Sequence, residues 1–421
     1  MNRLLQLAFA ALLACQLAAC VSPKTAPSPP IAGDALRDLD AAIQLAIEQK
    51  KLPSAVYHLE HQGRVYERAY GRLSYDENAA PTITGTLFDV ASLTKVVATT
   101  PSVLILVEEG GLSLDAHLVD YFPECANGGK ETITLRHLLT HVSGLPAGIP
   151  AKPSWSGVAA AKDLACRQVV TDPPGTKFRY SDVNYLLLGM LVEKASGQTL
   201  ADFATHRIYR PLGMKDTVFR PMSLVPPRYT QSDIAPTQTI TEESLKAGLH
   251  QDLAAGTVLR GTVHDPTARL MGGVAGSAGL FSTARDLALY ARMLLNGGEL
   301  NGSRVLSRET VRLMSTVQTP ESVRERRALG FDIDSSFSRP RGSLFPIGSF
   351  GHTGFTGCVL WIDPYSQSFY VFLSNRVYPR DGASIAPLYA TLGTLSAQAI
   401  AGNGFNFANV KGLEALPPVA P

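Results

Sequence analysis

The chain has 421 residues, of which 18% are charged, and its formal net charge at pH 7 is +2. No basic stripe or arginine-rich helix is present, so the composition argues against a nucleic-acid-binding surface. The length is enough for one large domain, or for two lobes with a substantial core.

The N-terminus has the features of a bacterial export signal. Arg3 precedes an apolar stretch, residues 4–15, that is too short to span a bilayer. The stretch leads to Leu17-Ala18-Ala19-Cys20, which resembles a lipobox, whose cysteine is lipidated. Residues 1–20 are therefore predicted to be a lipoprotein signal peptide, and residues 21–33 a proline-rich tether. Ordinary signal cleavage is the alternative, and it would leave an unanchored protein.

The first part of the folded body is predicted to contain a helix, a hairpin and a second helix. Residues 35–49 carry apolar side chains at helical spacing. Residues 54–60 and 65–70 flank a short turn, which is typical of a β-hairpin. A second helix is expected to begin near Ser92, because apolar residues continue from there to about residue 104.

The middle of the chain is predicted to be mainly helical. From about residue 110 to 270, helical segments alternate with loops rich in proline and glycine. Two of these helices are expected at residues 134–139, capped by Thr134, and at residues 182–193. A stronger helix is expected to begin at Thr283, another good capping residue.

The C-terminal part changes to strands. Four short runs are β-branched or aromatic in character and are predicted to be strands: residues 327–333, 351–354, 359–362 and 369–374. A last helix is expected at about 383–400. Because strands occur near both chain ends, the sequence predicts an α+β domain over residues 34–405 with a helical insert at about 110–270. Residues 406–421 are expected to form a tail.

Ser92 and Lys95 stand three residues apart, which would place their side chains on one face of a helix. A serine hydroxyl is a poor nucleophile until a neighbouring group takes its proton, and a desolvated lysine can do so. This spacing also arises easily by chance, and a surface serine beside a solvated lysine is then the simpler interpretation.

Two later motifs favour the catalytic interpretation of Ser92 and Lys95. Tyr180-Ser181-Asp182 follows a Pro-Gly turn, and residues 351–357 read Gly-His-Thr-Gly-Phe-Thr-Gly. With Ser92 and Lys95 they resemble the three motifs of the serine β-lactamase and penicillin-binding-protein-like hydrolases, namely Ser-x-x-Lys, Tyr-x-Asn and Lys/His-Thr-Gly. This family includes class C β-lactamases, D-Ala-D-Ala carboxypeptidases and related esterases. The likeness extends over roughly residues 35–400 and implies an antiparallel sheet flanked by helices plus an inserted all-helical lobe.

The resemblance implies how the reaction would proceed. Ser92 would attack a carbonyl and form an acyl-enzyme that water later releases. Lys95 or Tyr180 would take the serine proton, and Tyr180 would return one to the leaving group. The backbone N–H groups of Ser92 and Phe355 would stabilise the oxyanion.

The strand motif is expected to contact the substrate through His352, Thr353 and Gly354. Histidine replaces the lysine of the better-known variant of this motif. Because an ordinary histidine can be cationic or neutral near pH 7, carboxylate recognition by His352 is expected to depend on pH.

Asp182 departs from the family pattern, which has asparagine at this position. An ionised aspartate only accepts hydrogen bonds, so it is expected to pair with Lys95, raise the pKa of Lys95 and repel a substrate carbonyl. This argues against efficient β-lactam hydrolysis and favours esters or small peptides. Alternatively, Asp182 caps the helix that follows it.

Other groups of residues are weaker indications of a functional site. His137 and His141 have i, i+4 spacing and could ligate a metal, but no glutamate stands at position 138 as in zinc proteases. His264-Asp265 could be a charge-relay pair, although a loop-packing role is favoured. The Gly-x-Ser-x-Gly elbow of α/β-hydrolases is absent.

Three cysteines remain in the folded body. Cys125 and Cys166 could pair in an oxidising compartment, although the odd count argues against a disulfide framework. Cys358 lies in an apolar run and is expected to be buried.

The sequence therefore predicts a lipid-anchored envelope serine hydrolase with no metal and no other cofactor. Valine at position 21 favours the outer membrane, facing the periplasm. The expected substrates are small amides or esters, among them peptidoglycan stem peptides. β-Lactams rank behind these as expected substrates. A non-catalytic lipoprotein that binds muropeptides or partners is the main alternative from another class, and a histidine-based metalloprotein is a further one.

Overall fold

The computed structural model describes residue 31 and residues 33–412, except 153, 247, 249 and 251. The predicted signal peptide with Cys20, nearly all of the tether and the end of the predicted tail lie outside the described residues. No described helix is long and apolar enough to cross a membrane.

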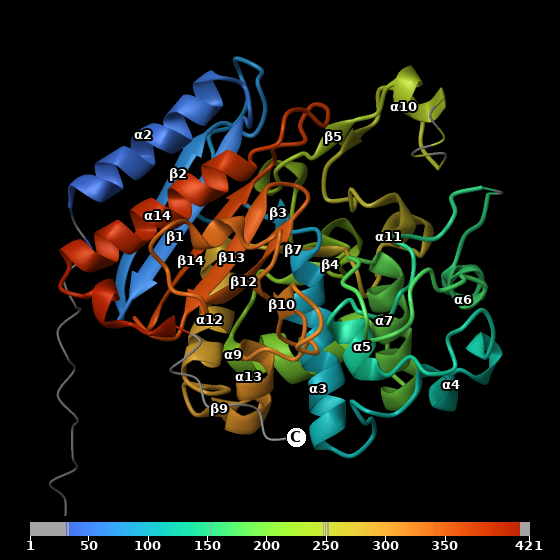
Figure 1. Ribbon diagram of the computed structural model, residues 1–421. Helices are drawn as coiled ribbons and strands as arrows, with labels where there is room; N and C mark the ends of the chain where they lie inside the picture. Colours follow the sequence, from blue (N-terminus) through green and yellow to red (C-terminus); the bar gives the residue numbers. More distant parts are fainter. Residues whose placement is uncertain are drawn as a thin grey trace, which may run out of the picture. The chain divides into compact units, whose positions relative to one another are not determined.

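The central feature is a seven-stranded antiparallel sheet built from both ends of the described chain (Figure 1). Its order is β10-β11-β12-β13-β14-β1-β2. The strands are β1 (Ser54–His61), β2 (Arg64–Gly71), β10 (Arg326–Arg327), β11 (Asp332–Asp334), β12 (Phe350–Gly354), β13 (Cys358–Asp363) and β14 (Ser368–Ser374). The predicted N-terminal hairpin is β1–β2, so the first and last strands of the sequence analysis pair in one sheet.

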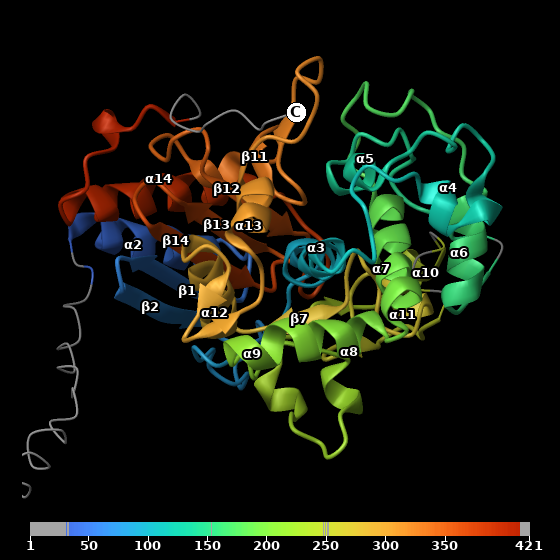
Figure 2. The ribbon, with the colours of Figure 1, turned by 90° about the horizontal axis from the view of Figure 1, so that it is seen from below.

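Both faces of this sheet are buried, because side chains of alternate residues point to opposite sides. In β13, Val359 and Trp361 pack into one apolar cluster while Leu360 and Ile362 pack into the other. The helices α2 (Asp34–Glu48) and α14 (Ala386–Gly402) lie together against one face, and α12 (Ala284–Leu295) lies against the other (Figure 2).

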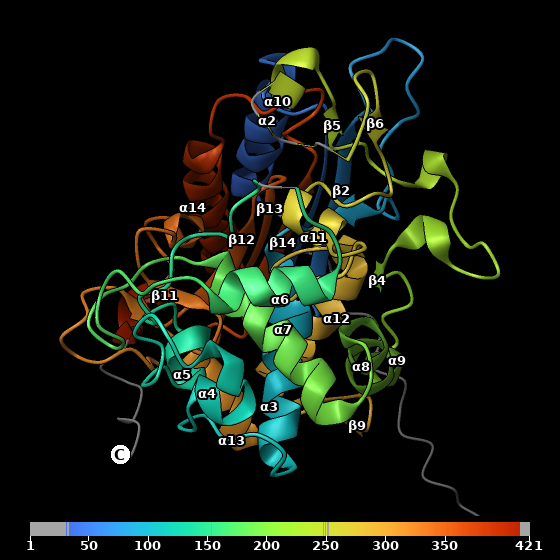
Figure 3. The same cartoon turned by 90° about the vertical axis from the view of Figure 1, so that its right-hand side faces the viewer.

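The helical part of the chain forms a lobe beside the sheet (Figure 3). Its helices are α3 (Thr100–Glu108), α4 (Leu118–Tyr121), α5 (Leu135–Leu139), α6 (Val158–Cys166), α7 (Asp182–Ser196), α8 (Leu200–Ala204), α9 (Arg210–Leu212), α10 (Glu242–Lys246) and α11 (Pro266–Leu270). The α+β fold predicted from the sequence is confirmed.

Several short elements lie outside the main sheet and the helices given above. They are β3 (Phe88–Asp89), β4 (Val218–Phe219) and β7 (Leu280–Ser282) in one small sheet, β5 (Gln238–Thr239) with β6 (Val258–Leu259), β8 (Glu299–Leu300) with β9 (Ser303–Arg304), and α13 (Arg308–Ser315). Cys125 and Cys166 form a disulfide bond in the helical lobe, and Cys358 is a free, buried cysteine.

Sequence features explain several boundaries. Thr134 and Thr283 cap α5 and α12 as predicted, because each side chain accepts a backbone N–H two or three residues into the helix. The prediction of one strand at residues 327–333 is wrong, since β10 and β11 are two strands joined by a turn. Gly330 makes that turn with a φ of 85°, a conformation in which other residues are strained.

Candidate active site

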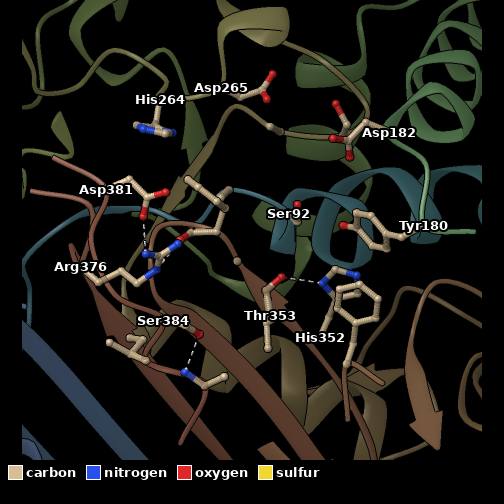
Figure 4. A pocket seen from close by; sticks show the side chains of 18 of the residues that line it. Ser92, Tyr180, Asp182, His264, Asp265, His352, Thr353, Arg376, Asp381 and Ser384 are labelled. Carbon is tan, nitrogen blue, oxygen red and sulfur yellow. Dashed lines mark hydrogen bonds and ion pairs between the residues drawn. The ribbon is translucent and has the colours of Figure 1, made fainter. Parts of the chain in front are cut away.

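A cavity of about 620 Å³ lies beside the end of β12 and is bordered by the helical lobe. The three predicted motifs meet there, since Ser92, Tyr180, Asp182 and the segment 352–355 all line the cavity (Figure 4). These residues come from three distant parts of the sequence. The fold therefore brings together every predicted catalytic or substrate-binding residue, with Lys95 in contact with Ser92.

Ser92 and Lys95 are held in a tight turn that leads into α3. Residues 95–99 form a π-helical turn, and Ala91, just before the nucleophile, has a φ of 47°. Such a conformation is uncommon for a non-glycine residue and is often found at functional sites. The Nζ atom of Lys95 donates to the Ser92 Oγ at 3.0 Å and to the carbonyl of Ser277 at 2.9 Å. The serine hydroxyl and the lysine amine are thus in direct contact.

Asp182 forms an ion pair with Lys95, with 2.7 Å between Nζ and Oδ1. Burial of Lys95 acts to lower its pKa, but the Asp182 carboxylate, together with Tyr180, outweighs burial and raises it. Lys95 is therefore an ammonium at neutral pH. The residue at the N-cap of α7 is Ser181, and Asp182 is the first helical residue, so its carboxylate serves the ion pair and not the cap.

Tyr180 is the third member of this group. Its ring stacks on His141 at 4.5 Å and on Phe337 at 5.1 Å between ring centroids, and Lys95 Nζ lies 5.1 Å from its centroid. Burial raises the pKa of the Tyr180 hydroxyl, while the charge of Lys95 and a hydrogen bond with Ser92 oppose the rise. The resting state is accordingly an ammonium beside a neutral phenol. Since the two groups are in close contact, they titrate as a pair.

The predicted oxyanion donors, the N–H groups of Ser92 and Phe355, both lie at the edge of the cavity. Neither donates to a protein acceptor among the described residues. Gly354 allows the two segments to approach closely, since a Cβ at this position would lie 2.4 Å from the carbonyl oxygen of Val90. The arrangement leaves two donors available for a developing oxyanion.

His352 lies at the cavity wall, but its expected titration near neutral pH is wrong. Burial, aided by the charges of Arg327 and Lys95, holds the pKa of His352 well below its usual value. Its Nδ1 atom lies 2.8 Å from the carbonyl oxygen of Thr353. His352 is therefore a neutral polar group at pH 7, because burial and the nearby cations Arg327 and Lys95 make a further positive charge unfavourable.

The two histidines considered as metal ligands, His137 and His141, each contact a backbone N–H group. The Nδ1 atom of His141 is within 3.1 Å of the Ser181 N–H, and that of His137 accepts the Thr134 N–H at 3.2 Å. In the described residues there is no group of three or more His, Cys, Asp or Glu side chains arranged to hold a metal ion.

His264 and Asp265 both line the cavity but do not form the relay pair considered from the sequence. The Nε2 of His264 contacts Gln238 Oε1 at 2.8 Å, and the Asp265 carboxylate accepts the Ala268 N–H at the start of α11. Burial, reinforced by the charge of Asp182, raises the pKa of Asp265 to about 6. Burial also lowers the pKa of His264 to about 3.

Several cavity residues were not predicted from the sequence, namely Phe337, Arg376, Asp381 and Ser384. Arg376 lies two residues after the end of the buried strand β14 and pairs with Asp381 at 2.6 Å (Figure 4). A charged residue just beyond a buried strand is a signal that could have indicated Arg376. Phe337 lies in an irregular loop and carries no comparable signal.

Comparison with known proteins agrees with this geometry. A sequence model of the β-lactamase family matches residues 39–394. The chain belongs to the β-lactamase family. It is 34% identical over 335 residues to an Escherichia coli K12 protein provisionally named a D-alanyl-D-alanine carboxypeptidase, covering 74% of this chain and 75% of that protein. A Salmonella typhi protein with the same provisional name is 32% identical over 308 residues, 70% of each chain.

Solved structures share the fold. EstCE1, a hydrolase with promiscuous acyltransferase activity, superposes with a TM-score of 0.67 at 20% identity and covers 86% of this chain and 98% of its own. A penicillin-binding protein homologue from Caulobacter crescentus gives a TM-score of 0.66 at 19% identity, with 88% and 98% coverage. The family match and the contact between Ser92 and Lys95 together identify the chain as a serine hydrolase of the β-lactamase family.

Proposed function

We propose that this serine hydrolase acts through a Ser92 acyl-enzyme on small amides and esters, with D-alanyl peptides as the leading substrates. The observation that carries the proposal is the direct contact of Ser92, Lys95 and Asp182 at the cavity. The relatives provisionally named D-alanyl-D-alanine carboxypeptidases support the peptide substrate.

The residues suggest the following reaction. The Ser92 Oγ attacks the substrate carbonyl carbon while its proton passes to the Lys95–Tyr180 pair, and the oxyanion accepts hydrogen bonds from the N–H groups of Ser92 and Phe355. When the tetrahedral intermediate collapses, the pair returns the proton to the leaving amine or alcohol. Water then attacks the acyl carbon and releases the acid from Ser92. Because Lys95 is an ammonium at rest, one proton must leave the pair before it can act as a base.

Esters are a second candidate, and the accept-only character of Asp182 favours them. An aspartate offers no N–H to a substrate amide carbonyl, so a substrate that does not need this contact loses less binding free energy. For the same reason β-lactams rank behind esters.

The test is to give the purified protein three probes side by side: a diacyl-lysyl-D-alanyl-D-alanine tripeptide, a short-chain p-nitrophenyl ester and a fluorescent penicillin. Release of D-alanine that disappears in Ser92→Ala supports the leading proposal. Turnover of the ester alone would favour the esterase. If no probe reacts, the non-catalytic binding protein becomes the better account.

We also propose that the protein is anchored to the outer membrane through lipidated Cys20 and faces the periplasm. The support is the lipobox-like sequence before Cys20 and the proline-rich segment after it. Cys20→Ser is expected to move the protein from the detergent-soluble membrane fraction to the soluble envelope fraction. Unchanged fractionation would mean that Cys20 is not lipidated or that another surface holds the protein at the membrane.

A further inference from the structure

The turn that carries Phe355 is tied directly to the segment that carries Ser92. Thr356 is fully buried, and its Oγ1 donates to the carbonyl oxygen of Asp89 at 2.7 Å. Asp89 lies three residues before Ser92 and also accepts the Ala91 N–H through its side chain. The Thr356 hydroxyl therefore links the two segments that supply the oxyanion donors, and the Cys358 thiol lies 3.7 Å from the same Asp89 carbonyl oxygen.

Arg376 holds the same turn from its other side. Its backbone N–H donates to the carbonyl of Thr356 at 3.0 Å, and its Nε donates to the carbonyl of Phe355 at 2.9 Å. Its guanidinium also lies over the Phe355 ring, 4.7 Å from the centroid, and pairs with Asp381. The turn is thus fixed from two directions, by Thr356 toward Ser92 and by Arg376 toward the loop after β14.

We propose that Thr356 is a positioning residue that sets the separation between the oxyanion-hole N–H groups of Ser92 and Phe355, with Arg376 bracing the turn. The inference rests on the Ser92 acyl-enzyme proposed above. Donors stabilise an oxyanion only at hydrogen-bonding distance from the place where its charge develops. Thr356 does not line the cavity, so it acts through Phe355 and not by touching the substrate.

A merely structural role for Thr356 predicts a different result. The hydroxyl would then contribute to the free energy of unfolding, and its loss would lower stability without a selective effect on the transition state. The two roles can be separated by comparing KM for the substrate with the affinity for an oxyanion mimic. Only the mimic needs both N–H donors at hydrogen-bonding distance from its oxyanion.

The experiment compares Thr356→Val, which keeps the shape and removes the hydroxyl, with Thr356→Ser, which keeps the hydroxyl. Thr316→Val is the matched control: Thr316 is also buried, donates to the carbonyl of Arg312 at 2.7 Å and lies outside the cavity. For each variant, kcat and KM for a p-nitrophenyl ester are measured, together with the melting temperature. The affinity for an alkyl trifluoromethyl ketone, whose serine adduct carries an oxyanion, is measured as well.

We expect Thr356→Val to lower kcat and the ketone affinity by about 10- to 100-fold with little change in KM, as for other small misplacements of catalytic groups. Thr356→Ser should retain both values, and Thr316→Val should lose stability alone. If Thr356→Val does not fold, Arg376→Lys, which keeps the charge but removes the Nε donor, should show the same pattern with a smaller loss.

Wild-type kcat and ketone affinity in a folded Thr356→Val protein would overturn the inference, as would equal losses in Thr316→Val. Ser92→Ala is measured in parallel. If that variant keeps its turnover, the acyl-enzyme proposal itself is wrong; if it is inactive while Thr356→Val is normal, only the positioning role is wrong.

Discussion

The two sides of the cavity differ in the kind of polar group that they present, charged on one side and neutral on the other. The helical side carries full charges in contact, the Lys95 ammonium and the Asp182 carboxylate, beside the Tyr180 phenol. The strand side presents the neutral imidazole of His352 and the N–H group of Phe355. Proton transfer is therefore assigned to the helical side, and stabilisation of the developing oxyanion to backbone groups that need no protonation change.

This difference indicates where pH and charge should matter. Groups on the helical side share protons, so a change in one alters the others. On the strand side, His352 is buried near two cations and stays neutral, so its substitution should not alter a titration near pH 7.

Lys95→Met should have the largest effect. It removes the group in contact with Ser92 Oγ while keeping the length of the side chain, and the loss of a proton-transfer group typically costs about 10²- to 10⁴-fold in rate. The measurement is kcat for a p-nitrophenyl ester, with circular dichroism to check the fold. A folded Lys95→Met protein with near-normal kcat would remove the helical side from the chemistry.

Asp182→Asn should have an intermediate effect. The amide relieves the charge that raises the pKa of Lys95 and offers an N–H to a substrate carbonyl. Penicillin acylation should rise relative to ester hydrolysis by about tenfold, the value of one hydrogen bond of about 1.4 kcal/mol. The rise of activity with pH should also move to lower pH, because Lys95 then loses its proton more easily.

The ratio of the two acylation rates in both proteins decides the role of Asp182. An unchanged ratio would mean that an N–H at position 182 gives a penicillin no advantage over an ester. A lower ratio would mean that the carboxylate assists catalysis, contrary to the role assigned here.

The smallest effect concerns Asp265, whose pKa is raised to about 6. Above that pH it is ionised and adds negative charge to the cavity, so KM for an ester bearing a carboxylate should rise as pH increases through 6. Coulomb repulsion through water is about 1 kcal/mol at 4 Å, so we expect KM to change by about fivefold.

Asp265→Asn, which can still cap α11, should remove this step in KM, and His352→Gln should leave it in place. A neutral ester of equal length is the control, and loss of the step in His352→Gln would show that His352 titrates after all.

The sequence predicted most of the helical side correctly. The spacing of Ser92 and Lys95 and the carboxylate at position 182 were sufficient to predict the ion pair between Lys95 and Asp182. Ser92 and Lys95 are neighbours along the chain, and Asp182 belongs to a known motif. It also placed both ends of β12, β13 and β14 within one residue, since short runs of β-branched and aromatic residues define strands well.

The parts that were missed depend on distant contacts. The low pKa of His352 arises from burial and from the charges of Arg327 and Lys95, which no local pattern reveals. Arg376 and Asp381 reach the cavity only because β14 lies in the middle of the sheet. The division of residues 327–333 into two strands depends on the turn at Gly330 and on the buried ion pair of Arg327 with Asp332.

The most direct test of the acyl-enzyme is to find the modified residue. The protein is incubated with a fluorophosphonate and, separately, with a penicillin, and its intact mass and its proteolytic peptides are then measured by mass spectrometry. We predict a single adduct on Ser92 that is absent from Ser92→Ala. An adduct on another serine, or an equal adduct in Ser92→Ala, would contradict the assignment of Ser92 as the nucleophile.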